Sequence, residues 1–431
     1  MSSMRPTPQR LSQRMAARLN RGDDLAAYRT VLRTRSYRRE AAAQGLERLG
    51  EWAYTIGMVV LAYGLTGSAA AVALLVLAHV VPRLQFVLAG QPLRLQHPQR
   101  VLRYACLARV PLVVVFLAVG SRADIAWAAL VALALGLLAA LSDAARGQLL
   151  QGLVERKQLA TVNMLTGRIE QACLLVGALV AAVLLLAWGT VATFVAAAGL
   201  LLGAAALRLG PDPAAAGANR PQEGLPRASA WRVLRNDRTQ RMLLTGLIAG
   251  AVLAMSLRVL LIDVVVSRHG YSEALYAGLL AVVGVGALAG PIPIARLLGK
   301  APAPFAALAL VLALAGGVAL LSLADVFILV APLLFLSGLL AITNDLVTTT
   351  VMRRLARPEL ASATFALLGA AVVVGQVVAL VAVLGLTPWL EATEVLLLAS
   401  AGCALAAALV WSRGPTNPAP LRATRRTTEQ R

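Results

Sequence analysis

The chain has 431 residues, of which 59% are hydrophobic and only 14% are charged, and its mean hydropathy is +0.76. Soluble domains usually carry about 25% charged residues, so this composition excludes a soluble protein. The net charge of +20 would suggest a nucleic-acid partner in a soluble chain, but here the arginines lie between long apolar segments with almost no aromatic residues among them. That placement is typical of membrane topology and excludes nucleic acid.

The first 40 residues hold ten arginines and no apolar run, which excludes a secretory signal and predicts a basic cytoplasmic arm over residues 1–40. Within the arm, the string LAAYRTVL (Leu25 to Leu32) follows the possible N-cap Asp24. Two interpretations stay open for it, a basic helix on anionic lipid and an unstructured tail.

About twelve apolar segments follow, each near the ~20 residues that an α-helix needs to cross a bilayer. We expect an all-α polytopic membrane protein with two six-helix bundles, over 41–209 and 240–412. A proline- and arginine-rich cytoplasmic linker, 210–239, joins them, and 413–431 form a cytoplasmic tail. The expected spans are 41–64, 68–90, 101–120, 124–148, 160–188, 189–209, 240–267, 273–298, 302–322, 324–350, 360–386 and 388–412.

Basic residues are concentrated in every second connection between these spans. The opposite connections offer only Arg122 and Arg268. Because positive residues favour the cytoplasmic side of a membrane, this bias predicts that both termini face the cytoplasm. The basic residues of the cytoplasmic connections are Arg94, Arg100, Arg103, Arg146, Arg156, Lys157, those within 220–238, Arg296, Lys300, Arg353, Arg354 and Arg357.

The two sets of spans contain matching strings about 202 residues apart, which indicates a duplicated six-helix unit. Two parallel halves related by a central axis predict a binding site between them, near the middle of the membrane. The matching strings are GLLAALSD (Gly136 to Asp143) with GLLAITND (Gly338 to Asp345), ERKQLA (Glu155 to Ala160) with ARPELA (Ala356 to Ala361), and Ser68 with Ser272.

The segments LGEWAYTIGMVVLAYGLTGSAAAVALLVLAHVVPRL (Leu49 to Leu84) and DAARGQLLQGLVERKQLATVNML (Asp143 to Leu165) resemble the major facilitator superfamily. Within it, the chain is similar to the branch of macrolide and siderophore (enterobactin-type) exporters, over about residues 30–410. The resemblance implies outward, proton-driven transport of a small molecule by a rocker switch in the bacterial cytoplasmic membrane. The partners implied are the lipid bilayer, a small-molecule substrate and protons, and we expect a monomer.

The chain departs from that pattern in two places. The family's cytoplasmic gating loop carries a Gly, an Asp and basic residues, and here the loop AGQPLRLQHPQR keeps Gly90, Arg94 and Arg100 but lacks the acid. The Gly and Pro pattern of the fifth helix in drug antiporters is reduced to Gly177. A non-transporting scaffold or sensor is therefore the alternative to a transporter.

The first span carries a polar stripe of Gln44, Glu47, Arg48, Glu51 and Thr55, which fall within a sector of about 100° and should face the bundle. Ionisable groups within a membrane are functional candidates by default. Glu47 and Glu51 are one turn apart, so their like charges would let one carboxyl bind a proton near neutral pH, although Arg48 opposes this. We expect proton coupling at Glu51. Glu47 is either a second coupling residue or a solvated headgroup-level residue.

Four further polar residues of the first half are candidates. Arg109, Arg168 and Glu170 are expected to line the substrate cavity, although both arginines could instead extend to the inner interface. His79 lies midway along the second span, where it either relays protons or packs as a neutral residue against neighbouring helices.

The second half offers fewer polar residues within its spans. Arg258 and Gln376 are expected to line the same cavity. Asp143, with its repeat counterpart Asp345, is expected to form structural ion pairs with loop arginines.

Other chemistry is not indicated. Cys106, Cys173 and Cys403 lie within apolar spans and are expected to serve packing, so we predict no disulfide and no metal site. The string GVGALAG (Gly284 to Gly290) mimics a dinucleotide fingerprint but lies in an apolar span, where small residues allow close helix packing. Neither catalytic spacing nor a phosphate-binding Gly-Lys-Ser/Thr motif is present, so we expect no enzyme, no nucleotide-driven pump and no cofactor.

Overall fold

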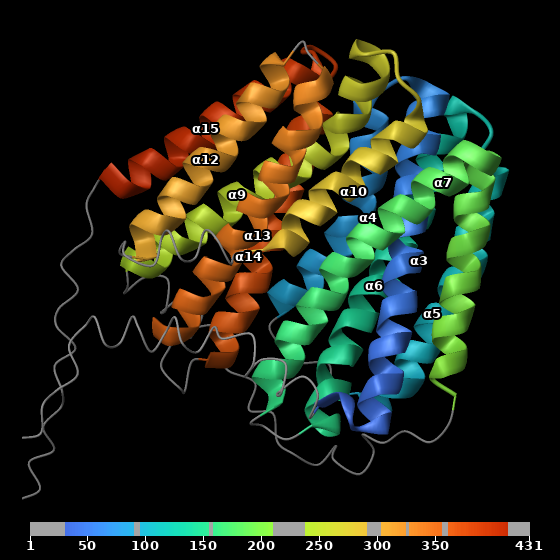
Figure 1. Ribbon diagram of the computed structural model, residues 1–431. Coiled ribbons are helices and arrows are strands. Elements are labelled where there is room, and N and C mark those ends of the chain that lie inside the picture. The colour runs from blue at the N-terminus through green and yellow to red at the C-terminus, as the bar shows by residue number, and fades with distance from the viewer. Residues whose placement is uncertain are drawn as a thin grey trace, which may run out of the picture.

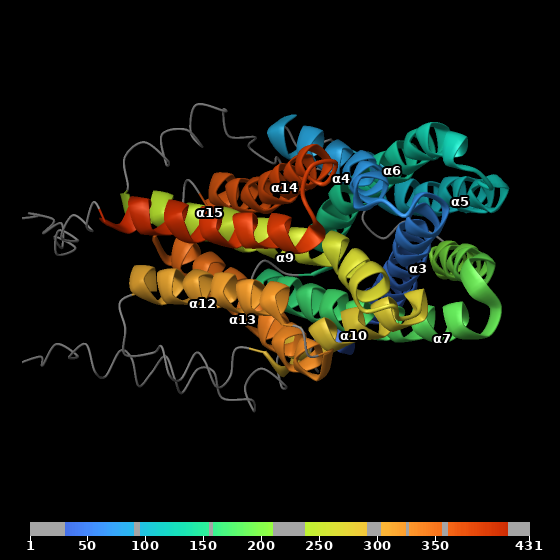
Figure 2. The same ribbon diagram turned by 90° about the horizontal axis from the view of Figure 1, so that it is seen from above.

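The structure, a computed structural model, describes residues 31–89, 95–154, 158–209, 238–290, 303–324, 327–355 and 361–412. Within these ranges all regular elements are helices, arranged as two groups side by side (Figures 1 and 2). The first group contains α3 (Arg35–Thr66), α4 (Ala69–Ala89), α5 (Pro98–Val115), η1 (Phe116–Ala118), η2 (Arg122–Asp124), α6 (Ile125–Leu153) and α7 (Leu159–Leu207). The second contains α9 (Arg238–Asp263), η5 (Val264–Arg268), α10 (Glu273–Ala289), α12 (Ala303–Leu323), η6 (Phe327–Leu329), α13 (Val330–Leu355), α14 (Ala361–Leu386) and α15 (Ala392–Ser412).

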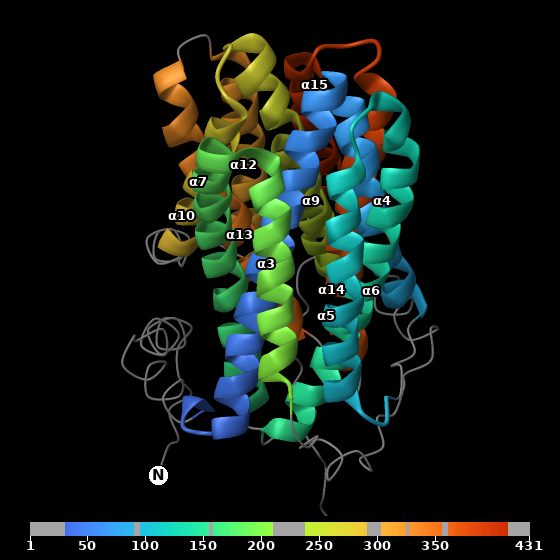
Figure 3. The same ribbon diagram turned by 90° about the vertical axis from the view of Figure 1, so that its right-hand side faces the viewer.

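The element α7 contains two of the predicted spans. Gly189 has φ 74° and ψ −167°, a conformation that is accessible almost only to glycine, and the chain reverses there. Figure 3 shows the two arms of α7 side by side, joined at the end opposite the start of α3. In the described part of the chain the eleven long α-helices, with α7 counted as two, therefore match the twelve predicted spans.

Eight of the described helices are long and apolar enough to cross a membrane. Shorter apolar segments, Ala69–Gln85 and Glu273–Ala289, lie in α4 and α10. Bulky side chains on their outer faces are exposed, among them Leu186 at 79% and Leu130 at 67%. Trp188 and Trp389, 71% and 85% exposed, lie at helix ends, the position of an aromatic belt at a membrane surface. The all-α polytopic fold class is confirmed.

Helix α3 begins earlier than the sequence predicts, at Arg35 and not at residue 41. It ends at Thr66, and the next residue, Gly67, has a left-handed conformation (φ 63°) in which its N–H donates to the carbonyl of Tyr63. Because of the early start, Glu40 belongs to the helix and not to the arm. Most of the predicted arm, linker and tail, residues 1–30, 210–237 and 413–431, lies outside the described residues.

The matching strings of the two halves form equivalent helix contacts. A Cβ atom added to Gly136 on α6 would overlap the carbonyl oxygen of His79 on α4. In the other half, a Cβ added to Gly338 on α13 would overlap the carbonyl oxygen of Val283 on α10. The glycine that opens each string therefore allows the same close approach of two backbones.

Candidate functional site

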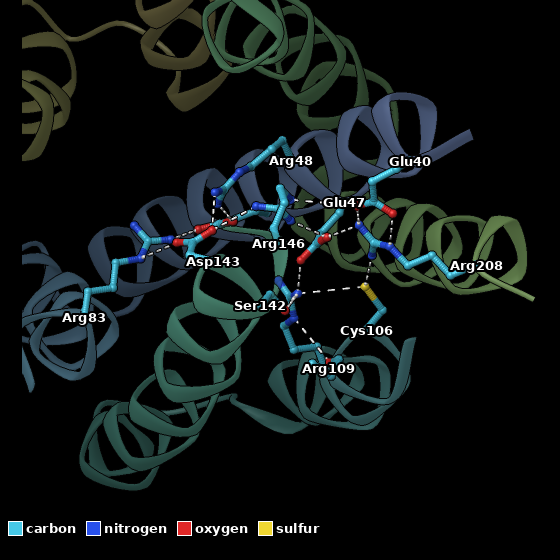
Figure 4. A network of polar contacts seen from close by, with 12 residues as sticks. Glu40, Glu47, Arg48, Arg83, Cys106, Arg109, Ser142, Asp143, Arg146 and Arg208 are labelled. Carbon is cyan, nitrogen blue, oxygen red and sulfur yellow. Dashed lines mark hydrogen bonds and ion pairs between the residues drawn. The ribbon is translucent and has the colours of Figure 1, made fainter. Parts of the chain in front are cut away.

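A buried charge network lies in the first helix group, and Glu47 on α3 is at its centre (Figure 4). The Glu47 carboxylate is 1% exposed and accepts hydrogen bonds or ion pairs from three arginines. Arg109 on α5 contacts one oxygen, while Arg146 on α6 and Arg208 at the end of α7 lie 2.7 and 2.8 Å from the other. Arg208 also forms a bidentate pair with Glu40, at 2.7 and 3.0 Å.

A second part of the network surrounds Glu51, one turn further along α3. Its carboxylate contacts Arg83 on α4, lies 2.6 Å from Arg48, and is 3.5 Å from Nε2 of His79. Arg48 in turn contacts Asp143 on α6 and lies 3.1 Å from Glu170 on α7.

Arg146 connects the two parts of the network. One terminal nitrogen of its guanidinium group lies 3.0 Å from Asp143, and the other lies 2.7 Å from Glu47. The network therefore draws side chains from α3, α4, α5, α6 and both arms of α7, which are all the spans of the first half.

Positive and negative groups balance in this network. Five arginines face five carboxylates, so the burial of each charge is compensated by an opposite charge and by hydrogen bonds. The arginines are Arg48, Arg83, Arg109, Arg146 and Arg208, and the acids are Glu40, Glu47, Glu51, Asp143 and Glu170.

Some buried polar atoms beside the network have no hydrogen-bond partner among the described residues. They include Nδ1 of His79, the hydroxyl of Tyr54 and one terminal nitrogen of Arg109. The His79 and Tyr54 rings meet edge to face with centroids 5.7 Å apart. These atoms offer buried donors and acceptors that the network itself does not use.

The two helix groups meet along α3 with α9, α4 with α14, and α7 with α10. Near the end of α3, the Tyr63 hydroxyl donates a 2.6 Å hydrogen bond to Asp263 and contacts Ser267. Near the middle of α3, the guanidinium group of Arg258 on α9 lies over the Trp52 ring, 5.4 Å from its centroid. The Tyr276 hydroxyl on α10 donates to the Arg258 carbonyl at 3.2 Å.

The structure brings together most of the first-half residues that the sequence indicated. Glu47 is buried among arginines and is not a solvated headgroup-level residue, and Arg109, at 0% exposure, does not extend to the interface. The repulsion expected between Glu47 and Glu51 is offset, because each carboxylate has its own arginine partners. The candidates that enter the network are Glu47, Arg48, Glu51, His79, Arg109, Asp143 and Glu170.

Other candidates lie elsewhere. Gln44 is buried, with its Nε2 unpartnered among the described residues, while Thr55, Gln376 and Asp345 are half-buried. Arg168 is exposed and approaches Gly290 at the end of α10. Of the gating loop, Arg100 is exposed in the first turn of α5, and Gly90 and Arg94 lie outside the described residues.

Sequence reasoning missed Glu40, Arg83, Arg146 and Arg208 as members of the network. Arg146 was expected in a cytoplasmic connection, but it lies within α6 and is buried. Arg83 could have been found, because it follows Pro82 inside an apolar span, where any ionisable residue is a candidate. Glu40 and Arg208 lie at the ends of their spans, and such charges are usually connection residues.

The sequence matches the family model of the Major Facilitator Superfamily over residues 41–379, so the chain belongs to that superfamily. No curated protein matches it. A mutant of the nucleoside transporter NupG has a similar structure, with a TM-score of 0.70 and 10% identity over 87% of this chain and 98% of that one. So has a bacterial homologue of the human lysosomal transporter Spinster, in an inward-facing and occupied conformation (TM-score 0.65, 13% identity, 88% and 97% covered).

A bacterial homologue of the iron transporter ferroportin, in an inward-facing state, is also similar, with a TM-score of 0.64 and 14% identity over 87% and 98% of the two chains. At such identities the likeness shows the fold alone. The protein is thus a multi-pass membrane protein with the fold of major facilitator transporters.

Proposed function

We propose that this protein is a secondary active transporter that exports an amphipathic small molecule in exchange for protons, by alternating access between its two helix groups. The substrate would be similar to those of the macrolide and siderophore exporters that the sequence resembles. The protein would act as a monomer in the cytoplasmic membrane of a bacterium, with both termini and the linker 210–239 in the cytoplasm.

The observation that carries this proposal is the position of Glu51. Its carboxylate is buried near the middle of α3, which we propose to span the membrane, and is shared among Arg48, Arg83 and His79. When Glu51 binds a proton it would lose its attraction for Arg83 on α4, so protonation would change the contacts between two helices. A proton can bias alternating access only if the two states hold it with different affinity. Separation of Glu51 from Arg83 in the opposite state would provide such a difference.

The position of His79 also supports proton coupling at Glu51. Its Nε2 lies 3.5 Å from the Glu51 carboxylate, while its Nδ1 is buried without a partner in the described part of the chain. Of the three histidines, only His79 lies within a helix. We propose that it relays protons to Glu51, with Glu47 as the further candidate.

We propose that the substrate binds between the two groups, against the less buried end of the network. Asp143 and Glu170 are 36% and 44% exposed there, and both contact Arg48. Arg258 would contribute from the second group. Gln44, Thr55, Arg109, Arg168 and Gln376 stay as further candidates of the cavity lining, Gly90, Arg94 and Arg100 as gating residues, and Asp345 as a structural ion-pair residue.

The first prediction concerns Glu51→Gln, which fixes a neutral side chain of nearly the same shape. Substrates would first be identified by a survival screen of a deletion strain across antibiotics and under iron limitation. In proteoliposomes, the variant should lose proton-driven uphill transport and keep counterflow exchange, because exchange needs no proton release. Glu391→Gln is the matched control, because Glu391 is exposed in the connection before α15.

Uphill transport by Glu51→Gln at the wild-type rate would assign coupling to Glu47, Glu170 or His79 instead. A non-transporting scaffold is the second candidate, because the gating loop lacks the acid found in the family. It would be supported if the wild-type protein moved no substrate of the screen.

A further inference from the structure

We propose that Arg258 binds the negatively charged group of the substrate, so that the transported molecule is a monoanion with an apolar or aromatic body. The inference rests on the proposed function, since it assigns a substrate class to the site between the two helix groups. It starts from the difference between Arg258 and the arginines of the charge network.

Arg258 is a deep cation without a carboxylate partner among the described residues. Its guanidinium group lies over the Trp52 ring of α3, and Arg258 itself lies within the candidate membrane span Thr239–Arg268. Each of Arg48, Arg83, Arg109, Arg146 and Arg208 contacts at least one acid. A charge at the centre of a bilayer is costly and is rarely left uncompensated, so Arg258 is the group that an incoming anion would satisfy.

The surroundings of Arg258 fix its position between the two groups. The Tyr276 hydroxyl on α10 binds the carbonyl of Arg258. On the other side, Trp52 packs closely on α7, because a Cβ added to Gly177 would lie only 2.8 Å from the Cβ of Trp52. The guanidinium group of Arg258 therefore lies against Trp52 of α3, while α10 contacts the Arg258 backbone and α7 contacts Trp52.

The chemistry of these groups selects the ligand. A guanidinium group binds carboxylate-like oxyanions through two parallel hydrogen bonds, and the indole ring of Trp52 offers an apolar face beside it. The five arginines and five acids of the network balance, whereas Arg258 has no acid beside it among the described residues. One negative charge on the substrate would neutralise it, whereas a cationic substrate would be repelled.

Two fluorescent probes with the same aromatic group test this inference. Dansylglycine carries a carboxylate and dansylamide is neutral, and both would be titrated against the full-length protein in lipid nanodiscs. The wild type should bind dansylglycine about tenfold more tightly than dansylamide, as expected for hydrogen bonds between charged groups. The preference should disappear in Arg258→Gln and persist in part in Arg258→Lys.

The control is Arg241→Gln, because Arg241 lies on the same helix, α9, with an exposed side chain. It should keep the wild-type preference. A second readout is the melting temperature of the ligand-free protein. Removal of an uncompensated charge in Arg258→Gln should leave this temperature unchanged or raise it, whereas a structural role of Arg258 predicts a decrease.

The inference is overturned if the wild type binds neither probe, does not distinguish between them, or if the preference survives Arg258→Gln. Its failure differs from failure of the proposed function. If the protein transports neutral substrates and shows no preference for anions, the inference about Arg258 fails and the proposed transport function stands. If it prefers anions and transports nothing, the anion site stands and the proposed transport function fails.

Discussion

At the scale of single residues, the buried network is organised around Glu47, on which three arginines of three different spans converge. A buried ion pair contributes little net stability compared with an apolar pair, because desolvation offsets the attraction. Removal of one partner is different, because it leaves the opposite charge buried and uncompensated. The network is therefore expected to hold the six spans of the first half in one arrangement.

The second prediction follows for Glu47→Gln. The substitution leaves Arg109, Arg146 and Arg208 with one carboxylate fewer, so the protein should be destabilised by about 3–5 kcal/mol. The expected result is a clear decrease in melting temperature in nanodiscs, followed by intrinsic tryptophan fluorescence.

Two control variants test whether the destabilisation of Glu47→Gln comes from the buried charge. Glu391→Gln, which removes an exposed acid, should not change the melting temperature. The double variant Glu47→Gln/Arg109→Gln should be less destabilised than the sum of its single variants, because it removes both members of a contact. Additive effects would show that the two side chains do not interact.

At the scale of helices, the close contacts of α4 with α6 and of α10 with α13 depend on glycines in equivalent positions. The third prediction is that Gly136→Ala and Gly338→Ala each destabilise the protein by about 1–3 kcal/mol, the typical cost of overpacking a close contact. Melting temperatures in nanodiscs provide the measurement.

Gly147→Ala is the matched control on α6, because a Cβ added at Gly147 meets no atom within 4 Å. Since glycine weakens a helix interior, this variant should be stabilised by about 0.5–1 kcal/mol. If Gly136→Ala behaved like Gly147→Ala, the two helices would not be in contact at that point.

The fourth prediction concerns the start of α6, where Asp124 accepts hydrogen bonds from the indole N–H of Trp127 (3.0 Å) and from the backbone N–H groups of Gly120 and Ser121 (3.1 and 2.8 Å). These hydrogen bonds, that from Trp127 first, lower the pKa of Asp124 from 3.8 to about 2. Because the pKa is lower in the folded protein, the stabilisation is present above the unfolded value and is lost as the pH falls toward 2.

Asp124→Asn should therefore have a lower melting temperature than the wild type at neutral pH, and the difference should shrink as the pH falls from 3.8 toward 2. The measurement is a series of melting curves of both proteins across this range. A difference that does not change with pH would show that the carboxylate charge is not involved.

At the scale of the whole molecule, the fifth prediction is the orientation in the membrane. Replacement of the buried Cys106, Cys173 and Cys403 by alanine provides a background without thiols. In intact cells, an impermeant thiol reagent should then label cysteines placed at Ser121 or Gly270 and should not label one placed at Arg100. Labelling of a cysteine at Ser229, in the linker, would contradict the twelve-span topology.

The sequence by itself determined the spans and their number. A helix satisfies its own backbone hydrogen bonds, and the bilayer sets its apolar length, so both properties are local in the chain. The repeat is also visible in the sequence, and it located Gly136 and Gly338, which the structure places in equivalent contacts.

Only the tertiary structure decided which charges are partners. Glu40 and Arg208 are 168 residues apart, and Glu47 and Arg109 are 62 apart. Their pairing depends on how each helix is rotated about its axis. Helices such as α6 and α7 are apolar on nearly all sides, so their sequence pattern does not reveal that rotation. For the same reason only packing showed that the network compensates Arg109, while Arg258 lies without a described acid at the interface of the two groups.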